Sequence, residues 1–322
     1  MNILITSAGR RNQLLQCFRQ SAAVLDLPLR ILAADLNPKM SSACQAADAS
    51  FTLPACGDAS YADSLIELCV RERVSLLVPT IDPELAPLSR ARGRFQEIGT
   101  TVAVSHESVV ALAGDKLVTA RQLDAAGIPT PKSLRLADYL ASPEALSGPL
   151  IAKPLNGSSS VGIVFAAGPD ELRALPTDCY LVQERWAGRE FTVNMFFDRG
   201  GKCVAAVPHE RIQVRSGEVS KGRTCRPPAV VALAEQVSKL LEGARGALCF
   251  QAILRSDGKA CVFEINARFG GGYPLAHQAG ATFSQWLLEE VAGLPATANN
   301  RWQDGVLMLR YDAAVFSSLG QP

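Results

Sequence analysis

The chain has 322 residues, enough for two or three domains, and its 32 basic and 31 acidic side chains give a formal net charge of +1. This balance argues against a nucleic-acid partner, and the sequence contains no uninterrupted apolar stretch of about 18 residues, which a membrane span requires. The first residues lack the pattern of a signal peptide, and the nine cysteines include no Cys-x-x-Cys pair. We therefore expect a cytoplasmic protein with reduced thiols and no membrane partner.

The first hundred residues alternate between short apolar runs and segments with helical spacing. We expect strands over residues 2–6, 29–34, 75–79 and 101–104, and helices over residues 11–25 and 64–71. This alternation predicts an α/β fold with a parallel, doubly wound sheet. Ligands of such sheets gather at the carboxyl ends of the strands, where this sequence has Arg10, Asp82 and Glu84. We take these three residues as candidate substrate contacts.

The turn after the first strand leaves two interpretations open. Asp35 ends the second strand and would suit a ribose, but Gly9 is followed by Arg10, Arg11 and Asn12 where a dinucleotide pyrophosphate needs glycines. An NAD site is thus the weaker alternative. Arg10 and Arg11 near a helix N-terminus can instead hold an anion such as a substrate carboxylate, or lie in a solvated first helical turn.

The middle of the chain predicts two helices, followed by two strands that flank a flexible loop. The helices cover residues 105–112 and 115–127, and the strands cover residues 150–153 and 163–166. The loop between the strands is rich in glycine and serine, so its backbone N–H groups can cradle phosphate oxygens. Lys153 directly precedes this loop and adds a positive charge. The loop is no Walker A motif, and a mobile hairpin without a ligand is the alternative.

Residues 179–184 predict another strand, and after a short linker a further strand begins at Glu190. The backbone of a strand–linker–strand arrangement can hydrogen-bond the edge of a purine base. An acidic side chain just beyond the linker, here Glu190, can then bind the ribose hydroxyls.

The most informative stretch is residues 260–273, Ala-Cys-Val-Phe-Glu-Ile-Asn-Ala-Arg-Phe-Gly-Gly-Gly-Tyr. Glu264, Asn266 and Arg268 are spaced two apart, so on an extended chain they share one face. A carboxylate, an amide and a cation on one face suit Mg²⁺ together with a phosphate oxygen. An upstream apolar run predicts a hairpin in which Gln251 faces Glu264. An edge hairpin with a solvated polar face is the alternative.

These motifs occur in a fixed order along the chain, namely Lys116, Lys153 with its Gly/Ser loop, Gln183-Glu184 with Glu190, and Glu264-x-Asn266-x-Arg268. Together they resemble the ATP-grasp superfamily, in particular its carbamoyl phosphate synthetase large-chain-like branch, over about residues 1–311. The resemblance implies a Rossmann-like, parallel-sheet pre-ATP-grasp domain over residues 1–112 and an ATP-grasp domain of two α+β subdomains over residues 113–322. Within the latter it implies a mobile lid at about 130–184 and a catalytic subdomain at about 185–311.

The resemblance also implies roles for individual residues. Three cations, Lys116, Lys153 and Arg268, would be catalytic. Three oxygen-bearing side chains, Gln251, Glu264 and Asn266, would be ligands of Mg²⁺ or Mn²⁺. The residues implied in ATP binding are Lys116, Lys153, Asn156, Gly157, Ser158, Ser159, Ser160, Val161, Gly162, Gln183, Glu184, Arg185, Trp186 and Glu190.

Further candidate substrate contacts lie in two other stretches. Arg211, Lys221 and Arg223 can bind a carboxylate or phosphate, or lie in a solvated loop. Gly271 and Gly272 would let a substrate approach the backbone. The carbamoyl phosphate synthetase pattern has a second arginine where this chain has Gly271, which argues against bicarbonate and favours a larger carboxylate such as an amino acid.

The resemblance implies an ADP-forming, C–N bond-forming carboxylate–amine ligase that uses ATP and Mg²⁺ on small-molecule substrates. Such an enzyme activates the carboxylate as an acyl phosphate, which the amine then attacks. Dimers are common in this family, so the resemblance also implies a homodimer. The alternatives are an ATP-grasp kinase that phosphorylates a small molecule, a non-catalytic nucleotide-binding module, and dinucleotide-dependent redox chemistry.

Overall fold

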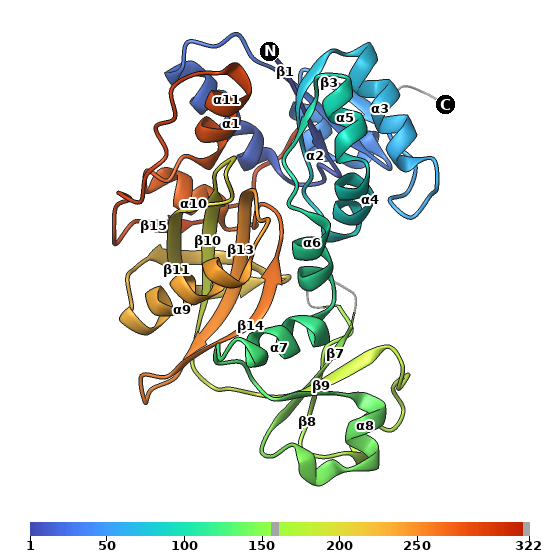
Figure 1. Cartoon of the computed structure of the whole chain (residues 1–322), viewed down its shortest axis with the longest axis vertical. Helices are drawn as coiled ribbons and strands as arrows, with labels where there is room; N and C mark the ends of the chain where they lie inside the picture. The colour runs from blue at the N-terminus through green and yellow to red at the C-terminus, as the bar shows by residue number, and fades with distance from the viewer. Residues whose placement is uncertain (156–160, 318–322) are drawn as a thin grey trace.

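The computed structural model describes residues 1–155 and 161–317, and within these residues the strands form three sheets. Figure 1 shows the parallel N-terminal sheet and a small lid sheet at opposite ends of the long axis of the molecule. A larger central sheet lies between them. In the described part of the chain, no helix is both long enough and apolar enough to cross a membrane.

The N-terminal sheet is parallel throughout, with the strand order β3-β2-β1-β4-β5. Its strands are β1 (Asn2–Thr6), β2 (Arg30–Asp35), β3 (Ala49–Thr52), β4 (Val74–Val78) and β5 (Thr101–Val102). The helical segments between them are α1 (Asn12–Val24), η1 (Pro38–Met40), α2 (Ser42–Ala46), α3 (Tyr61–Arg71), η2 (Asp82–Glu84), α4 (Leu85–Arg90) and α5 (Arg92–Glu97).

Both faces of the N-terminal sheet are buried. Leu4 of β1 joins one hydrophobic core, whereas its neighbours Ile3 and Ile5 join another, because successive side chains of a strand point to opposite faces. The predicted α/β class and the parallel, doubly wound sheet are therefore confirmed. The sequence did not predict β3, since Phe51 is the one large apolar side chain in this four-residue strand.

Two helices, α6 (Glu107–Gly114) and α7 (Lys116–Ala125), lead from the N-terminal sheet to the rest of the chain. Asp115 lies between them in an extended conformation, and its side chain accepts hydrogen bonds from Leu117 N at 2.8 Å and Val118 N at 3.1 Å. This cap satisfies two of the unpaired N–H groups at the helix start. It places Lys116 at the first position of α7.

The lid sheet is antiparallel and has its own small hydrophobic core. Its elements are β6 (Ser133–Arg135), α8 (Leu136–Ala141), η3 (Pro143–Ala145), β7 (Leu150–Pro154), β8 (Val164–Ala166), η4 (Asp170–Leu172) and β9 (Tyr180–Glu184), with the strand order β6-β9-β7-β8. Leu136, Tyr139, Leu172 and Val182 lie at the centre of that core. This core is separate from the two larger cores of the molecule.

The central sheet is antiparallel, with the strand order β14-β13-β10-β11-β12-β15. Its strands are β10 (Arg189–Phe197), β11 (Cys203–Arg215), β12 (Glu218–Thr224), β13 (Gly246–Leu254), β14 (Ala260–Asn266) and β15 (Leu307–Leu309), and its helices are α9 (Pro228–Leu240), α10 (Tyr273–Gln278) and α11 (Phe283–Ala292). The predicted hairpin is confirmed as β13–β14, and Gln251 pairs with Glu264 in its register. The domain boundaries at 112, 130, 184 and 311 stay predictions.

The stretch around Arg211, for which a solvated loop was an alternative, forms the β11–β12 hairpin. Polar residues and Pro208 inside β11 make this strand hard to predict from the sequence pattern, because proline is rare within a sheet.

The N-terminal domain packs directly against the domain that contains the central sheet. Ser21 of α1 and Ser284 of α11 are buried with their hydroxyl oxygens 2.8 Å apart, and Phe18 packs edge-on against Phe269 at 6.1 Å between ring centres.

Candidate active site

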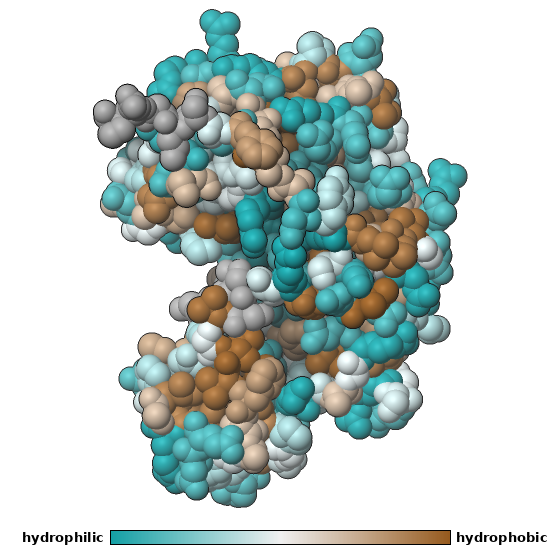
Figure 2. Space-filling model, turned by 180° about the vertical axis from the view of Figure 1, so that it is seen from behind, coloured by the Kyte–Doolittle hydropathy of each residue, from teal (hydrophilic) through white to brown (hydrophobic). Residues whose placement is uncertain are grey.

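A cavity of about 910 Å³ lies where the three sheets meet. Residues of β7, β9, β10, β11, β13 and β14 line it, together with Arg11 and Asp82 of the N-terminal domain. Figure 2 shows the surface hollowed between the lid end of the molecule and the remainder. A cavity of this size at a domain junction is typical of a cofactor or substrate site.

One wall of the cavity is the polar face of β14 and its extension. Asn266 Nδ2 lies 3.5 Å from Glu264 Oε1, and Arg268 Nη2 donates to Asn266 Oδ1 at 3.0 Å. Arg268 also binds Asp82 Oδ2 at 2.7 Å. Burial disfavours the Arg268 charge, but the Asp82 carboxylate outweighs it and keeps the pKa of the guanidinium above its usual value. The alternating side chains thus share one face, as their spacing predicts.

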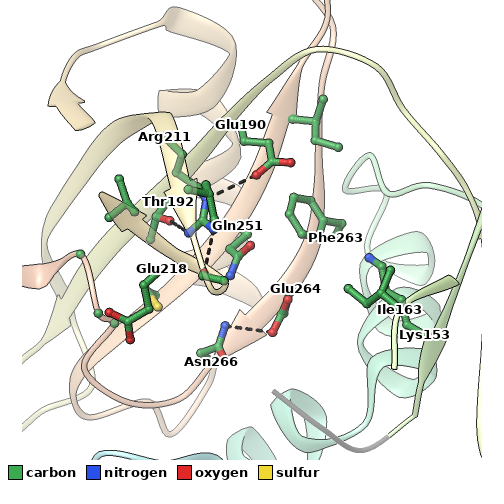
Figure 3. Close-up of a pocket in the computed structure, with 18 of the residues that line it drawn as sticks. Lys153, Ile163, Glu190, Thr192, Arg211, Glu218, Gln251, Phe263, Glu264 and Asn266 are labelled. Atoms are coloured by element: carbon green, nitrogen blue, oxygen red, sulfur yellow. Dashed lines mark hydrogen bonds and ion pairs between the residues drawn. The ribbon is translucent and has the colours of Figure 1, made fainter. Parts of the chain in front are cut away.

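Lys153 of β7 reaches this wall from the lid (Figure 3). Its side chain is 7% exposed, and its ammonium donates to Gln183 Oε1 at 2.9 Å. The ammonium also lies 4.8 Å from the ring centre of Phe263. Burial lowers the pKa of Lys153, nearby Glu264 raises it, and Lys116 lowers it further, with a net decrease. The ammonium groups of both lysines and the Glu264 carboxylate are therefore close enough to influence one another electrostatically.

Gln183 has a second hydrogen bond, from its Nε2 to Ser133 Oγ at 2.9 Å. It is 4% exposed and ties two lid strands to the Lys153 ammonium. Since its amide oxygen is engaged by the ammonium, Gln183 acts here as a support for Lys153.

The linker after β9 forms another wall. Glu184 accepts hydrogen bonds from Ser147 N at 3.2 Å and Ser147 Oγ at 3.3 Å. The guanidinium of Arg185 lies 4.8 Å from the ring centre of Phe165. Trp186, beside Arg185, also lines the cavity. The linker residues Glu184, Arg185 and Trp186 thus all line the cavity.

Glu190 and Arg211 form an ion pair across β10 and β11, with Glu190 Oε2 3.4 Å from Arg211 Nε (Figure 3). Arg211 also donates to Thr192 Oγ1 at 3.3 Å and to Gly217 O at 3.0 Å. Both partners line the cavity. Glu190, which was expected to bind the ribose, is thus held beside the guanidinium of Arg211.

The floor of the cavity consists of the glycines before α10. A Cβ atom on Gly271 would lie 2.4 Å from the carboxyl carbon of Glu218, and one on Gly272 would lie 2.6 Å from His209 Nε2. His209 is fully buried, and among the described residues its Nε2 has no hydrogen-bond partner. Burial, aided by Arg211 and Arg310, lowers the pKa of His209 to about 3, so the ring is neutral. These contacts explain why glycine is needed at Gly271 and Gly272.

The structure does not bring four of the predicted substrate residues to the cavity. Arg10 is exposed, and its neighbour Arg11 lines the cavity instead. Lys221 and Arg223 point outward from β12, because the alternate residues of this strand are buried. Glu84 is completely buried, and its carboxylate accepts hydrogen bonds from Tyr61, Thr80, Ile81 and Ser7, which is a structural role.

The predicted phosphate loop lies partly outside the described residues, which exclude Asn156, Gly157, Ser158, Ser159 and Ser160. Val161 lines the cavity. Gly162 has a φ of +75° and lies close to Pro154 and Tyr180.

The sequence analysis did not identify Glu218, which lines the cavity, or Arg310, which contacts Glu218, and it left Arg11 as one of two alternatives. Glu218 bridges the two arginines, with its oxygens 3.1 Å from Arg11 Nη1 and 2.9 Å from Arg310 Nη1. The one local signal is the Ser216-Gly217 turn, which fixes where Glu218 begins β12. Nothing in the sequence around Arg310 indicates a site.

The predicted metal ligands fit Mg²⁺ in kind. Glu264, Asn266 and Gln251 offer one carboxylate and two amide groups at the cavity, and Mg²⁺ prefers oxygen donors. Among the residues that the structure describes, no three His, Cys, Asp or Glu side chains cluster as a metal site. A site with so few protein ligands suits an ion that is held mainly by phosphate oxygens and water.

Comparison with known proteins places these features in a family. Residues 3–103 match the model of the PylC-like, N-terminal domain, and residues 113–272 match that of the ATP-grasp domain. The D-alanine–D-alanine ligase of Chromohalobacter salexigens is 31% identical over 161 residues, which are 47% of this chain and 48% of that protein. That of Magnetococcus marinus is 26% identical over 220 residues, 61% of this chain and 71% of that protein. The chain thus spans about half the length of the first relative.

Solved structures show the same fold. The biotin carboxylase domain of Hydrogenobacter thermophilus 2-oxoglutarate carboxylase, in complex with MgADP, ADP and bicarbonate, has a TM-score of 0.73 at 15% identity, covering 95% of this chain and 73% of that one. The L-amino acid ligase from Bacillus licheniformis has a TM-score of 0.67 at 19% identity, covering 90% and 73%. The predicted order, a parallel-sheet domain followed by an ATP-grasp fold, is confirmed.

Proposed function

This chain belongs to the ATP-grasp superfamily, and on that basis we propose that it is a ligase that activates a carboxylate with ATP and joins it to an amine. ADP and phosphate are the other products. One observation carries the proposal: Lys116, Lys153 and Arg268 line a single cavity with Glu264 and Asn266, although they come from α7, the lid and the end of β14.

The first step transfers the γ-phosphoryl group of ATP to a carboxylate, so two anions must meet. Cations on both sides of the moving group reduce their repulsion and stabilise the charge of the transition state. Lys153 supplies a desolvated cation from the lid, and Arg268 supplies another from beyond the end of β14. Lys116 adds its charge at the start of α7.

Glu264, Asn266 and Gln251 would hold Mg²⁺ against the phosphates, and the bound ion would neutralise part of their charge. The linker Glu184–Trp186 would receive the adenine, and Glu190 the ribose hydroxyls. The acyl phosphate hydrolyses readily in water, so the lid sheet would close over it. The separate core of the lid supports this motion.

An amino acid is the proposed carboxylate. The curated relatives are D-alanine–D-alanine ligases, and one structural neighbour is an L-amino acid ligase. The cavity of about 910 Å³ has room for a substrate larger than bicarbonate next to Arg268.

The test is a hydroxylamine-trapping screen. Purified protein is incubated with ATP, Mg²⁺, hydroxylamine and single amino acids of both configurations, and hydroxamate and ADP are measured together. The proposal expects equal amounts of both with a subset of amino acids, and neither product from the Lys153→Ala variant. Lys132→Ala, which removes an exposed lid lysine, is the matched control. A phosphorylated substrate without hydroxamate would favour a kinase, and no ADP above background would refute the proposal.

A further inference from the structure

A charge pair at the glycine end of the cavity has no part in phosphoryl transfer. Arg11 and Glu218 both line the cavity and lie 3.1 Å apart. Figure 3 shows Glu218 on the opposite side of the cavity from Lys153. Glu218 therefore lies across the cavity from the lysine that is proposed to bind the phosphates.

Arg310 stands behind this pair. Its Nη1 donates to Glu218 Oε2 at 2.9 Å, and its Nη2 donates to the backbone oxygen of Gly271. Arg310 follows β15 and lies outside both matched family models. It fixes the Glu218 carboxylate and the glycine floor relative to one another.

The floor is shaped around the Glu218 carboxylate. A Cβ on Gly271 would lie within 2.5 Å of its three carboxyl atoms. Glu218 follows a tight turn in which Ser216 and Gly217 have φ values of +50° and +77°. Burial opposes the charge of Glu218, but Arg11 and Arg310 outweigh it and lower the pKa of this carboxyl. An ionised carboxylate is thus presented to the cavity.

The charges at this end do not balance. At the pair itself, two guanidinium groups, Arg11 and Arg310, contact the single carboxylate of Glu218, which leaves one positive charge. Burial lowers the pKa of Arg11, and Arg268 and Arg310 lower it further, which Glu218 offsets in part. A ligand with one carboxylate would neutralise the excess.

We propose that Arg11 and Glu218 form the subsite for an α-amino acid that serves as the amine acceptor, with Arg11 binding its carboxylate and Glu218 its ammonium. Arg310 is a positioning residue. This inference rests on the proposed ligase function. A donor amino acid uses its carboxylate in the acyl phosphate, so a second carboxylate-binding group is left for the acceptor.

The acceptor ammonium must lose one proton before it can attack, and this proton goes to solvent, because Arg11 and Arg310 lower the pKa of Glu218 and make it a weak base. The freed lone pair then forms the C–N bond to the acyl carbon. The bond between the acyl carbon and the phosphate oxygen breaks, and its electron pair leaves with the phosphate. The second proton of the attacking nitrogen also leaves with the phosphate, so atoms and charges balance.

Hydroxylamine separates this subsite from the first half-reaction, because it has no carboxylate and reacts as a neutral nucleophile. With a donor found in the trapping screen, two rates are measured: hydroxamate formation, and amide formation with each of the twenty standard amino acids and with its carboxamide. The wild-type protein should prefer the free acid over the carboxamide about tenfold or more, as expected for loss of a charged hydrogen bond.

Glu218→Gln and Arg11→Gln should each lower the ratio of amide to hydroxamate formation about tenfold or more. Arg310→Gln should lower it less. The matched control is Asp312→Asn, which breaks the exposed ion pair between Arg215 and the C-terminal segment and should leave the ratio unchanged.

Equal use of free acids and carboxamides by the wild type would overturn the subsite. So would a parallel loss of both rates in the Glu218 and Arg11 variants, which would identify the pair as a structural link between the domains. The proposed function fails differently: the wild-type protein then forms no hydroxamate with any donor, and the subsite falls with it.

Discussion

The ammonium of Lys153, carried by the lid strand β7, lies 4.8 Å from the ring centre of Phe263 on β14. Phe263 directly precedes Glu264, so the lid cation is held beside the proposed metal ligand without a direct ion pair between them. The aromatic face and the Gln183 amide oxygen together stabilise a charge that burial disfavours.

Replacing Lys153 by alanine should abolish ADP formation, with a loss of at least about a hundredfold, because the moving phosphoryl group loses a desolvated cation. Gln183→Leu should lower kcat/KM for ATP about tenfold, since Lys153 keeps its charge but loses its hydrogen-bond partner. Both are measured by coupled ADP release, with the melting temperature as the check on folding. Equal activity of Gln183→Leu and wild type would show that Gln183 does not position Lys153.

Glu264→Gln should raise the Mg²⁺ concentration needed for half-maximal ADP formation about tenfold or more, because an amide is a weaker ligand than a carboxylate. Calorimetric titration with ADP at several Mg²⁺ concentrations measures the same change without turnover. Glu184→Gln, at the linker, is the comparison and should shift nucleotide affinity without changing the Mg²⁺ dependence. An unchanged Mg²⁺ dependence in Glu264→Gln would remove Glu264 from the metal site.

His209 should make the protein less stable in mild acid. Burial lowers its folded pKa to about 3, whereas an unfolded histidine titrates near pH 6.5. Between these values the unfolded state binds the extra proton, so stability falls as the pH decreases, by about 1.4 kcal/mol per pH unit. Urea unfolding at about pH 5 and about pH 7 should show a smaller difference in His209→Gln than in wild type. The same difference in both proteins would contradict this account.

Gly272→Ala should destabilise the protein by about 1–3 kcal/mol, because the new methyl group meets the buried His209 ring at 2.6 Å. Thermal unfolding measures the change. Gly57→Ala is the matched control, since a Cβ at Gly57 meets nothing within 4 Å. If both variants melt at the wild-type temperature, the floor is looser than its contacts indicate.

Asp115→Ala should cost about 1 kcal/mol of stability through the lost helix cap. The start of α7 should also fray, which weakens the placement of Lys116 and raises KM for ATP. Asp115→Asn retains an acceptor oxygen and should preserve both properties. Equal KM values for the alanine and asparagine variants would show that the Asp115 cap does not contribute to nucleotide binding.

Much of the fold follows from local sequence patterns, whereas the roles of Lys116, Lys153 and Arg268 were implied by the family resemblance. Strands and helices of the N-terminal domain have clear periodicity, and alternation on an extended strand puts Glu264 and Asn266 on one face wherever the strand lies. The Asp115 cap is equally local, because its partners are the next residues along the chain.

The arrangement of charged residues around Glu218 was decided by the tertiary structure alone. Whether Arg10 or Arg11 faces inward depends on how α1 packs, and Glu84 turned out to be enclosed by hydrogen-bond donors. Glu218 meets Arg11 and Arg310 from distant parts of the chain. Periodicity reports which face of an element is apolar, but it carries no information about which distant element that face will meet.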